Sequence, residues 1–466
     1  MPCRGLPIQS PPAIEMTPEK PIIVIGGGLA GCEAAWQLLT RGRPVVIYEM
    51  KPEVFSPAHK SPNLAELVCS NSLRSNMPGN AVGLLKEEMR VMNSLIIEAA
   101  DRTAVPAGKA LAVDRARFST YVEEKLLSQE RLTIIRKELR EIPDDHMVVI
   151  ATGPLTSHAL AKSIAELTGG DYLYFYDAIS PIIYGDSIDY TKVFRASRYG
   201  GGEGDYLNCP MERAEYEQFW QALIEGEEVP LKPFEELKFF SGCLPIEILA
   251  RSGKHTLTFG PMKPVGLLDP KTGKQPHAVV QLRQEDEGGR LFNMVGFQTK
   301  LTWPEQRRIL RMIPGLENAE FARYGSIHRN TFINSPALLG DTLQLRTKDN
   351  VYFAGQITGA EGYVESSAIG LLAGLSAFSR LCGRVMTPPP ATTALGAMLH
   401  YIVHADQKNF QPMNINFGIF PPLGEKVPKK DRGQYYAERS LKALRDWKEK
   451  QDSDFSSFSI AVGDTA

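Results

Sequence analysis

Two of the six cysteines in this chain of 466 residues lie where a thiol could react. Cys69 ends an apolar stretch and opens the polar cluster SNSLRSN, in which Arg74 is close enough in sequence to favour a thiolate. Cys243 follows Gly242 and precedes Pro245 by two residues, a pattern typical of a bent loop that presents its side chain. A buried, unreactive cysteine is the commoner state, so residue types alone leave both thiols as candidates.

A glycine-rich turn near the start of the chain could bind a dinucleotide. Its GxGxxG spacing lies between an apolar run, 21–25, and a helical pattern, 30–40, and Glu49 ends a second apolar run, 45–48. The first glycine permits the tight turn, the second lets the backbone approach a pyrophosphate, and the third lets the helix pack closely on the strand. The free N–H groups of the helix then face the phosphates, and the carboxylate accepts hydrogen bonds from a ribose. The predicted cofactor residues here are Gly26, Gly27, Gly28, Leu29, Ala30, Gly31 and Glu49.

Two later turns favour FAD over a nicotinamide as the bound dinucleotide. Thr152 and Gly153 follow the apolar run 147–151, and Gly355 and Gln356 follow the run 351–354. Each turn alone could simply cap a strand, but three such turns in one chain favour a flavin site, to which Gly362 and Tyr363 are added. No second strand–GxGxxG–helix is present, so NAD(P)H would bind without a Rossmann domain of its own.

These turns need a mostly parallel, covered sheet, because strands alternate with helices around 21–50, 147–153 and 351–381. The predicted fold class is α/β, a Rossmann-like FAD-binding domain of the glutathione reductase type with an inserted α+β domain. The inserted domain carries alternating, strand-like stretches at 255–259 and 277–282. The predicted organisation is a disordered leader (1–20), the first part of the FAD-binding domain (21–169), the inserted domain (170–330), and the second part with a C-terminal tail (331–466).

Basic residues interleaved with aromatics suggest contact with unpaired RNA, because cations contact phosphates and rings stack on bases. Such groups surround Lys263, Lys300 with Trp303, and the run His328-Arg329-Asn330 after Tyr324. A solvated charged face explains Arg307 and Arg308 better. The His328 run precedes re-entry into the flavin sheet, where ligand crevices lie. The predicted substrate-binding residues are Asn71, Arg74, Lys263, Lys300, His328, Arg329 and Asn330.

The sequence closely resembles the bacterial folate- and FAD-dependent tRNA (uracil-5-)-methyltransferases, which make ribothymidine in the T-loop. The matching stretches span essentially residues 21–420 and include IGGGLAGCEAAWQL, AELVCSNSLRSN, FSGCLPIE, HRNTFINSP and FAGQITGAEGYVES. The resemblance implies FAD as cofactor, NAD(P)H as reductant, 5,10-methylenetetrahydrofolate as carbon donor, and the T-loop uridine of tRNA as substrate. It also implies that Cys69 and Cys243 are the active thiols.

That chemistry explains why two thiols and a flavin would share a site. A thiolate that adds at uracil C6 makes C5 a nucleophile for a methylene group. A base then removes the C5 proton, and reduced flavin supplies a hydride. We expect Cys243 to attack C6 and Cys69 to be the acid–base partner, although the reverse order is equally compatible with the sequence.

The amino-acid composition limits the class of protein and the kinds of partner that the chain can have. With 43% hydrophobic and 23% charged residues, the chain is an ordinary globular protein, and no apolar run reaches the ~18 residues of a membrane span. Few, irregularly spaced cysteines fit neither a disulfide framework nor a metal site. A net charge of −2 means that an RNA-binding face must concentrate its Lys and Arg, with a modest salt dependence. We expect a cytoplasmic protein without a membrane or stable protein partner.

Three other functions are compatible with parts of the sequence. A related flavoprotein family modifies the wobble uridine of tRNA, but its members are longer and carry an extra helical C-terminal domain. Here only about 80 residues follow the last flavin motif, too few for such a domain. A small-molecule flavin oxidoreductase would not need two loop thiols or the run His328-Arg329-Asn330. A flavin-dependent RNA chaperone or regulator without turnover stays open, and an assay for 5-methyluridine separates it from the enzyme.

Overall fold

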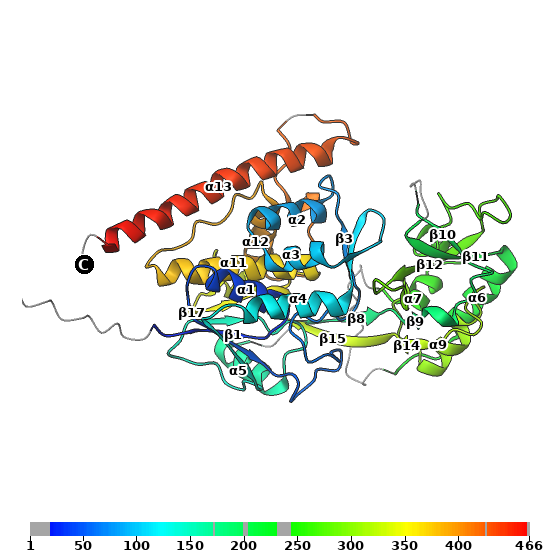
Figure 1. Cartoon of the computed structure of the whole chain (residues 1–466), viewed down its shortest axis with the longest axis horizontal. Coiled ribbons are helices and arrows are strands. Elements are labelled where there is room, and N and C mark those ends of the chain that lie inside the picture. Colours follow the sequence, from blue (N-terminus) through cyan, green and yellow to red (C-terminus); the bar gives the residue numbers. More distant parts are fainter. Residues whose placement is uncertain (1–18, 171–172, 199–203, 231–243, 425, 464–466) are drawn as a thin grey trace, which may run out of the picture.

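The computed structural model describes residues 19–170, 173–198, 204–230, 244–424 and 426–463. Almost all of the predicted leader, most of the glycine-rich run 200–204 and Cys243 lie outside these residues. The chain forms a larger part, which carries the long helices, and a smaller part at one end of the molecule (Figure 1). No helix of the described residues combines the length and apolar character that a membrane span requires.

The larger part is built on a six-stranded sheet in the order β16-β17-β7-β1-β2-β6. Every neighbouring pair is parallel except β16 with β17. The strands predicted at 21–25, 45–48, 147–151 and 351–354 are all present, and the α/β fold class is confirmed. The edge strand β6 was not predicted. The strands are β1 (Ile22–Ile25), β2 (Val45–Glu49), β6 (Leu132–Arg136), β7 (Val148–Ile150), β16 (Gln344–Leu345) and β17 (Lys348–Phe353).

Two helices, α1 (Leu29–Leu39) and α11 (Tyr363–Leu381), pack backbone to backbone beside this sheet. A Cβ atom at Gly370 would lie 2.3 Å from the Ala30 carbonyl oxygen, and one at Gly374 would lie 2.7 Å from that of Ala34. This close approach holds the two helices side by side (Figure 1). Around them lie α2 (Ala81–Val91), α3 (Leu95–Arg102), α4 (Arg115–Leu127), α5 (His158–Thr168), α10 (Ser335–Leu338) and a small sheet of β3 (Ser72–Ser75), β4 (Ala104–Val105) and β5 (Ala110–Val113).

The smaller part has an antiparallel sheet in the order β10-β11-β12-β13-β9-β14 with its own apolar core. An antiparallel ribbon of β8 (Leu173–Ile179) and β15 (Ser326–Phe332) connects it to the larger part (Figure 1). The strand expected at 255–259 is wrong, because Thr256–Phe259 is a short helix, whereas 277–282 does fall largely in a strand. The elements are β9 (Ile182–Tyr184), β10 (Phe194–Ala196), β11 (Tyr206–Met211), β12 (Ala278–Gln284), β13 (Leu291–Met294), β14 (Phe321–Arg323), α6 (Arg213–Glu225), α7 (Ile246–Arg251), α8 (Thr256–Phe259) and α9 (Trp303–Leu310).

The region expected to be a C-terminal tail contains two helices, α12 (Ala394–His404) and α13 (Arg432–Gly463). Glu88 on α2 anchors both of them. Its buried carboxylate accepts hydrogen bonds from the N–H groups of Ala394 and Leu395, at 2.7 and 2.8 Å, and from the Ser440 hydroxyl. One carboxylate thus joins three helices that are far apart in sequence.

Glu88 predicts a specific dependence of stability on pH. Burial raises its pKa from 4.5 to about 7. Because this folded-state pKa lies above the unfolded value, the contribution to stability is full below about pH 4.5, declines up to about pH 7 and is then level. We expect the stability of the wild type relative to Glu88→Gln to fall by up to about 3 kcal/mol across this range. Thermal melting of both proteins at a series of pH values measures it.

The matched control is Glu87→Gln, a change at a partly exposed carboxylate on the same helix. Its melting temperature should follow that of the wild type at every pH. A difference between wild type and Glu88→Gln that stays constant from about pH 5 to about pH 8 would contradict the prediction.

Candidate cofactor and thiol site

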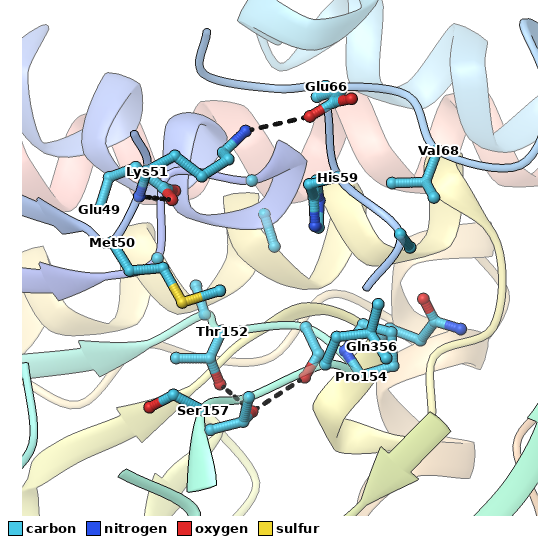
Figure 2. Close-up of a pocket in the computed structure, with 18 of the residues that line it drawn as sticks. Glu49, Met50, Lys51, His59, Glu66, Val68, Thr152, Pro154, Ser157 and Gln356 are labelled. Carbon is cyan, nitrogen blue, oxygen red and sulfur yellow. Dashed lines mark hydrogen bonds and ion pairs between the residues drawn. The ribbon is translucent and has the colours of Figure 1, made fainter. Parts of the chain in front are cut away.

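A cavity runs along the ends of β1, β2 and β7 and encloses about 1290 Å³, part of it open to solvent. It is the place where the three predicted turns meet, as expected at the carboxyl ends of parallel strands. Figure 2 shows side chains of these turns around it, with Glu49 and Lys51 facing Thr152 and Gln356 across the opening. The predicted site residues that line it are Gly26, Gly28, Leu29, Ala30, Glu49, Cys69, Thr152, Gly153, His328, Asn330, Gln356 and Tyr363.

The glycines of the first turn differ in what surrounds them. Gly26 has a φ of +105°, and a Cβ there would lie 2.5 Å from the Ala151 carbonyl oxygen. A Cβ at Gly31 would lie 1.9 Å from the Gly26 carbonyl oxygen. A Cβ at Gly28 would meet no atom within 4 Å, although Gly28 lines the cavity. Gly26 and Gly31 are therefore required by the packing of the protein itself, because a side chain there would collide with the backbone. The open space at Gly28 instead fits a bound pyrophosphate beside the N-terminus of α1.

Glu49 is held at the rim of the cavity by backbone donors. One carboxylate oxygen accepts the Gly27 N–H at 2.8 Å, and the other accepts the Lys51 N–H at 3.0 Å. The Lys51 ammonium forms an ion pair with Glu66 at 3.3 Å (Figure 2). Each oxygen of a carboxylate has a second acceptor position, so Glu49 still fits the hydroxyl groups of a ribose.

The second and third turns close the opposite side of the cavity. The Thr152 hydroxyl lies 2.7 Å from that of Thr156, and the Gln356 amide donates to Glu361 at 2.7 Å. Four predicted cofactor residues lie behind the lining: Gly27, Gly31, Gly355 and Gly362. These residues shape the turns, and Gly362 has a φ of +107° at the N-cap of α11.

Cys69 meets Tyr363, the first residue of α11, at the edge of the cavity. The tyrosine hydroxyl oxygen accepts the N–H of Cys69 at 2.7 Å and that of Ser70 at 3.3 Å, and it lies 3.0 Å from the Cys69 sulfur. Because the oxygen already accepts from two N–H groups, its own proton is available for the sulfur. Burial and the neighbouring Cys69 raise the pKa of Tyr363 well above its usual range, so it remains a donor.

Three arginines from distant parts of the chain hold the segment that carries Cys69. Arg115 donates to the Leu67 carbonyl oxygen at 2.8 Å, Arg323 donates to the Val68 carbonyl oxygen, and Arg283 donates to the Ser70 hydroxyl at 2.7 Å. All three guanidinium groups also interact electrostatically with Cys69. The arrangement favours negative charge on the sulfur. No sequence signal marked these residues as a group, because they lie far apart from one another in the sequence.

The residues predicted to bind substrate are not brought together. Lys300 is buried in an ion pair with Glu228 at 2.5 Å, and Lys263 lies in the smaller part, away from the cavity. Asn71 is fully buried, donates to the Val113 and Gln284 carbonyl oxygens, and accepts from Arg283, which joins β5 to β12. The polar groups of Asn71 and Lys300 are thus bound to other parts of the protein. Cys243 lies outside the described residues.

His328 and Asn330 lie on β15 and line the cavity, and Arg329 lies between them on the same strand. Burial, followed by the positive charges of Arg323 and His59, lowers the pKa of His328 to about 4. Its ring is therefore neutral at pH 7 and lies within 3.0 Å of the Ser326 hydroxyl. A neutral ring can donate or accept one hydrogen bond toward a ligand.

Arg74 uses its charge within the protein, in an ion pair with the fully buried Glu365 on the first turn of α11. Glu365 also accepts the Ile415 N–H at 3.0 Å. We expect Arg74→Gln to lower stability by about 3 kcal/mol, because it leaves a buried carboxylate without its cation. This is the low end of the range for buried pairs, since Arg74 is 40% exposed.

Chemical denaturation of Arg74→Gln, Glu365→Gln and the double variant measures this pair as a mutant cycle. The double variant should be more stable than the sum of the two single losses predicts. Additive losses would contradict a direct coupling. Flavin content, recorded in parallel, reports whether α11 keeps its place in the cavity.

Comparisons with known proteins agree with this architecture. The family model described as "Glucose inhibited division protein A" (GIDA) matches residues 21–384. A protein of Syntrophus aciditrophicus named methylenetetrahydrofolate–tRNA-(uracil-5-)-methyltransferase TrmFO is 64% identical over 94% of this chain and 100% of its own length. One of the same name from Geobacter sulfurreducens is 58% identical over 91% of this chain and 98% of its own.

A solved structure, that of Aquifex aeolicus GidA, has the same fold. It is 17% identical, covers 92% of this chain and 73% of its own, and superposes with a TM-score of 0.66. The resemblance found in the sequence is thereby confirmed: this chain belongs to the glucose inhibited division protein A family, and its relatives at 58–64% identity are named methylenetetrahydrofolate–tRNA-(uracil-5-)-methyltransferase TrmFO.

Proposed function

We propose that this protein is an FAD-dependent enzyme that methylates C5 of a tRNA uridine with 5,10-methylenetetrahydrofolate as carbon donor. The observation that carries the proposal is the Cys69 sulfur, 3.0 Å from the Tyr363 hydroxyl in the lining of the cavity where the three turns meet. The names of relatives at 58–64% identity support the same reaction. A cytoplasmic location in a bacterial cell follows from the substrate.

FAD is the group that best fits the cavity. Gly28 gives open space for a pyrophosphate, Glu49 offers acceptor positions for a ribose, and the N-termini of α1 and α11 both face the cavity. When bound, reduced flavin supplies the hydride that turns a methylene group at C5 into methyl. NAD(P)H is the proposed source of those electrons.

The protein's own groups supply nucleophile, acid and base. The thiolate of Cys243 adds to C6 of the uracil ring, and the C5–C6 electron pair then attacks the methylene carbon of the folate. Cys69 accepts the C5 proton, and the bond from the methylene carbon to the folate nitrogen breaks with its electron pair on nitrogen, which leaves an exocyclic methylene at C5. Addition of a hydride converts this methylene into methyl, and the C6–S bond then breaks to release the Cys243 thiolate. The O–H of Tyr363 stabilises the Cys69 thiolate before the proton transfer and is positioned to exchange a proton with it.

The proposed position is the T-loop uridine, with His328 and Asn330 on β15 as residues that face the substrate side of the cavity. Neutral His328 and the Asn330 amide can hydrogen-bond the polar edges of a flipped-out uracil or the folate without adding charge. Modification of the wobble uridine is the alternative, and the product distinguishes the two.

One assay tests the function. The FAD-loaded protein is incubated with NADPH or NADH, 5,10-methylenetetrahydrofolate and an unmodified tRNA transcript, and the nucleosides are then analysed by mass spectrometry. The expected product is 5-methyluridine in the T-loop fragment. No modified nucleoside with FAD bound would overturn the proposal, and a modified anticodon fragment would support the wobble-uridine alternative.

A further inference from the structure

Three aromatic rings form a stack on the smaller part of the molecule. Trp303, the first residue of α9, lies parallel to Tyr324, with ring centroids 5.4 Å apart and planes inclined by 16°. Tyr324 in turn stacks on Phe321, at 4.9 Å and 20°. Phe321 packs against the apolar core of this part, so the stack extends from the core outward and ends at the indole of Trp303.

The outermost ring is open to solvent. Trp303 is 63% exposed, whereas large aromatic side chains usually bury most of their area. The rings beneath it fix its orientation, so little conformational freedom is lost when another flat ring stacks on top. The geometry therefore suits a planar aromatic ligand better than an irregular apolar one.

The charges around the stack suit an anionic partner. Arg307 donates to the Tyr324 hydroxyl at 3.0 Å, with its guanidinium carbon 6.0 Å from the ring centroid. Among the described residues, Arg311, at the other end of α9, donates to the Ala319 carbonyl oxygen, whereas Arg308 is paired with Glu305. In the part of the chain that the structure describes, neither Arg307 nor Arg311 takes part in an ion pair. One arginine, Arg307, that has no ion pair among those residues and lies against the stack favours the combination of a base and its phosphate.

The stack is connected to the cavity through the short chain segment that carries Tyr324. The preceding residue, Arg323, donates to the Val68 carbonyl oxygen next to Cys69. Four residues after Tyr324, His328 lines the cavity. Figure 1 shows α9 and β14 together at the end of β15, the strand that leads back to the larger part. The stack and the lining of the cavity are therefore four positions apart along the chain.

We propose that an unpaired base of the tRNA substrate stacks on the exposed face of Trp303, while Arg307 contacts the phosphate beside it. This inference rests on the proposed function, which makes tRNA the substrate. It assigns Arg307 a binding role, where the sequence alone favoured a solvated charged face. The stack anchors the RNA outside the cavity and takes no part in the chemistry.

The test compares two replacements that keep apolar bulk at position 303. Trp303→Leu removes the aromatic face, and Trp303→Phe keeps one. Binding of the FAD-loaded protein to a fluorescently labelled, unmodified tRNA transcript should weaken about 5- to 150-fold with Trp303→Leu, the effect typical of one lost base stack, and change little with Trp303→Phe. Tyr190→Leu is the matched control, because Tyr190 is a 51% exposed aromatic residue of the same part outside the stack.

Abasic transcripts identify the partner base. Removing the stacked base should weaken wild-type binding by a similar factor and cause no further loss in Trp303→Leu. Binding of Trp303→Leu within twofold of the wild type would overturn the inference. If wild type makes 5-methyluridine and Trp303→Leu binds normally, only the inference fails. If wild type makes no methylated uridine and Trp303→Leu still binds tRNA more weakly, the function fails and the stacking surface stands.

Discussion

Replacing Cys69 by alanine is expected to lower the rate of 5-methyluridine formation by about two to four orders of magnitude, the contribution typical of one positioned acid–base group. The thiol lies 3.0 Å from the Tyr363 hydroxyl, and three arginines hold the segment that carries it. The variant should keep its FAD, because Cys69 hydrogen-bonds to Tyr363 on α11 and is not part of the glycine turn. Nucleoside mass spectrometry measures the first effect, and the flavin absorbance measures the second.

Two variants make this prediction specific. Cys382→Ala changes a buried thiol just after the end of α11 and should leave the rate unchanged. Tyr363→Phe removes the O–H next to the Cys69 sulfur and leaves the two N–H groups without their acceptor. It should slow the reaction less than Cys69→Ala and shift its pH–rate profile. Undiminished methylation by Cys69→Ala would remove Cys69 from the mechanism.

The same preparations separate the two thiols. If Cys243 attacks C6, Cys243→Ala should keep the yellow flavin and lose any covalent complex with tRNA, which is visible as a slower band in a denaturing gel. Cys69→Ala should still form that complex, because the acid–base step follows attack at C6. A complex undiminished in Cys243→Ala would move the nucleophile to Cys69.

The sequence predicts those parts of the site that depend on short-range patterns. The turn after β1 is recognisable because a strand, three glycines and a helix follow one another within 20 residues. Gly26 and Gly31 have a local steric reason, whereas Gly28 leaves space for the ligand. The apolar runs that became β2, β7 and β17 were recognisable for the same reason, since parallel strands buried on both faces are apolar throughout.

Contacts between residues far apart in the sequence could not be predicted from such short-range patterns. Cys69 and Tyr363 are 294 residues apart, and only the fold brings them within 3.0 Å. The polar cluster after Cys69 was interpreted as substrate-binding, yet the structure commits Asn71 to three internal hydrogen bonds and Arg74 to Glu365. A polar run indicates that partners exist, but it does not show whether those partners are a ligand or the rest of the protein.

The sharpest test of the cofactor site is Gly28→Glu, which should yield folded but colourless protein. Gly28 has a φ of −76° and a ψ of −172°, which any residue adopts, and a Cβ there meets no atom of the protein within 4 Å. The polypeptide can therefore accept a side chain at this position. A bound pyrophosphate cannot, because the new carboxylate would occupy its space and repel its charge. An unpaired buried charge costs about 3–5 kcal/mol, so FAD affinity should fall at least 10²-fold.

Two further glycines serve as controls, one at which a side chain should be tolerated and one at which it should destabilise the fold. Gly79→Ala also meets no atom within 4 Å but lies outside the cavity, so it should keep both fold and flavin. Gly31→Ala places a Cβ 1.9 Å from the Gly26 carbonyl oxygen and should lower the melting temperature itself. The decisive pattern is loss of flavin without loss of the fold at Gly28 alone. Stoichiometric FAD in Gly28→Glu would show that the pyrophosphate lies elsewhere, because the new side chain would then fill space that the cofactor does not use.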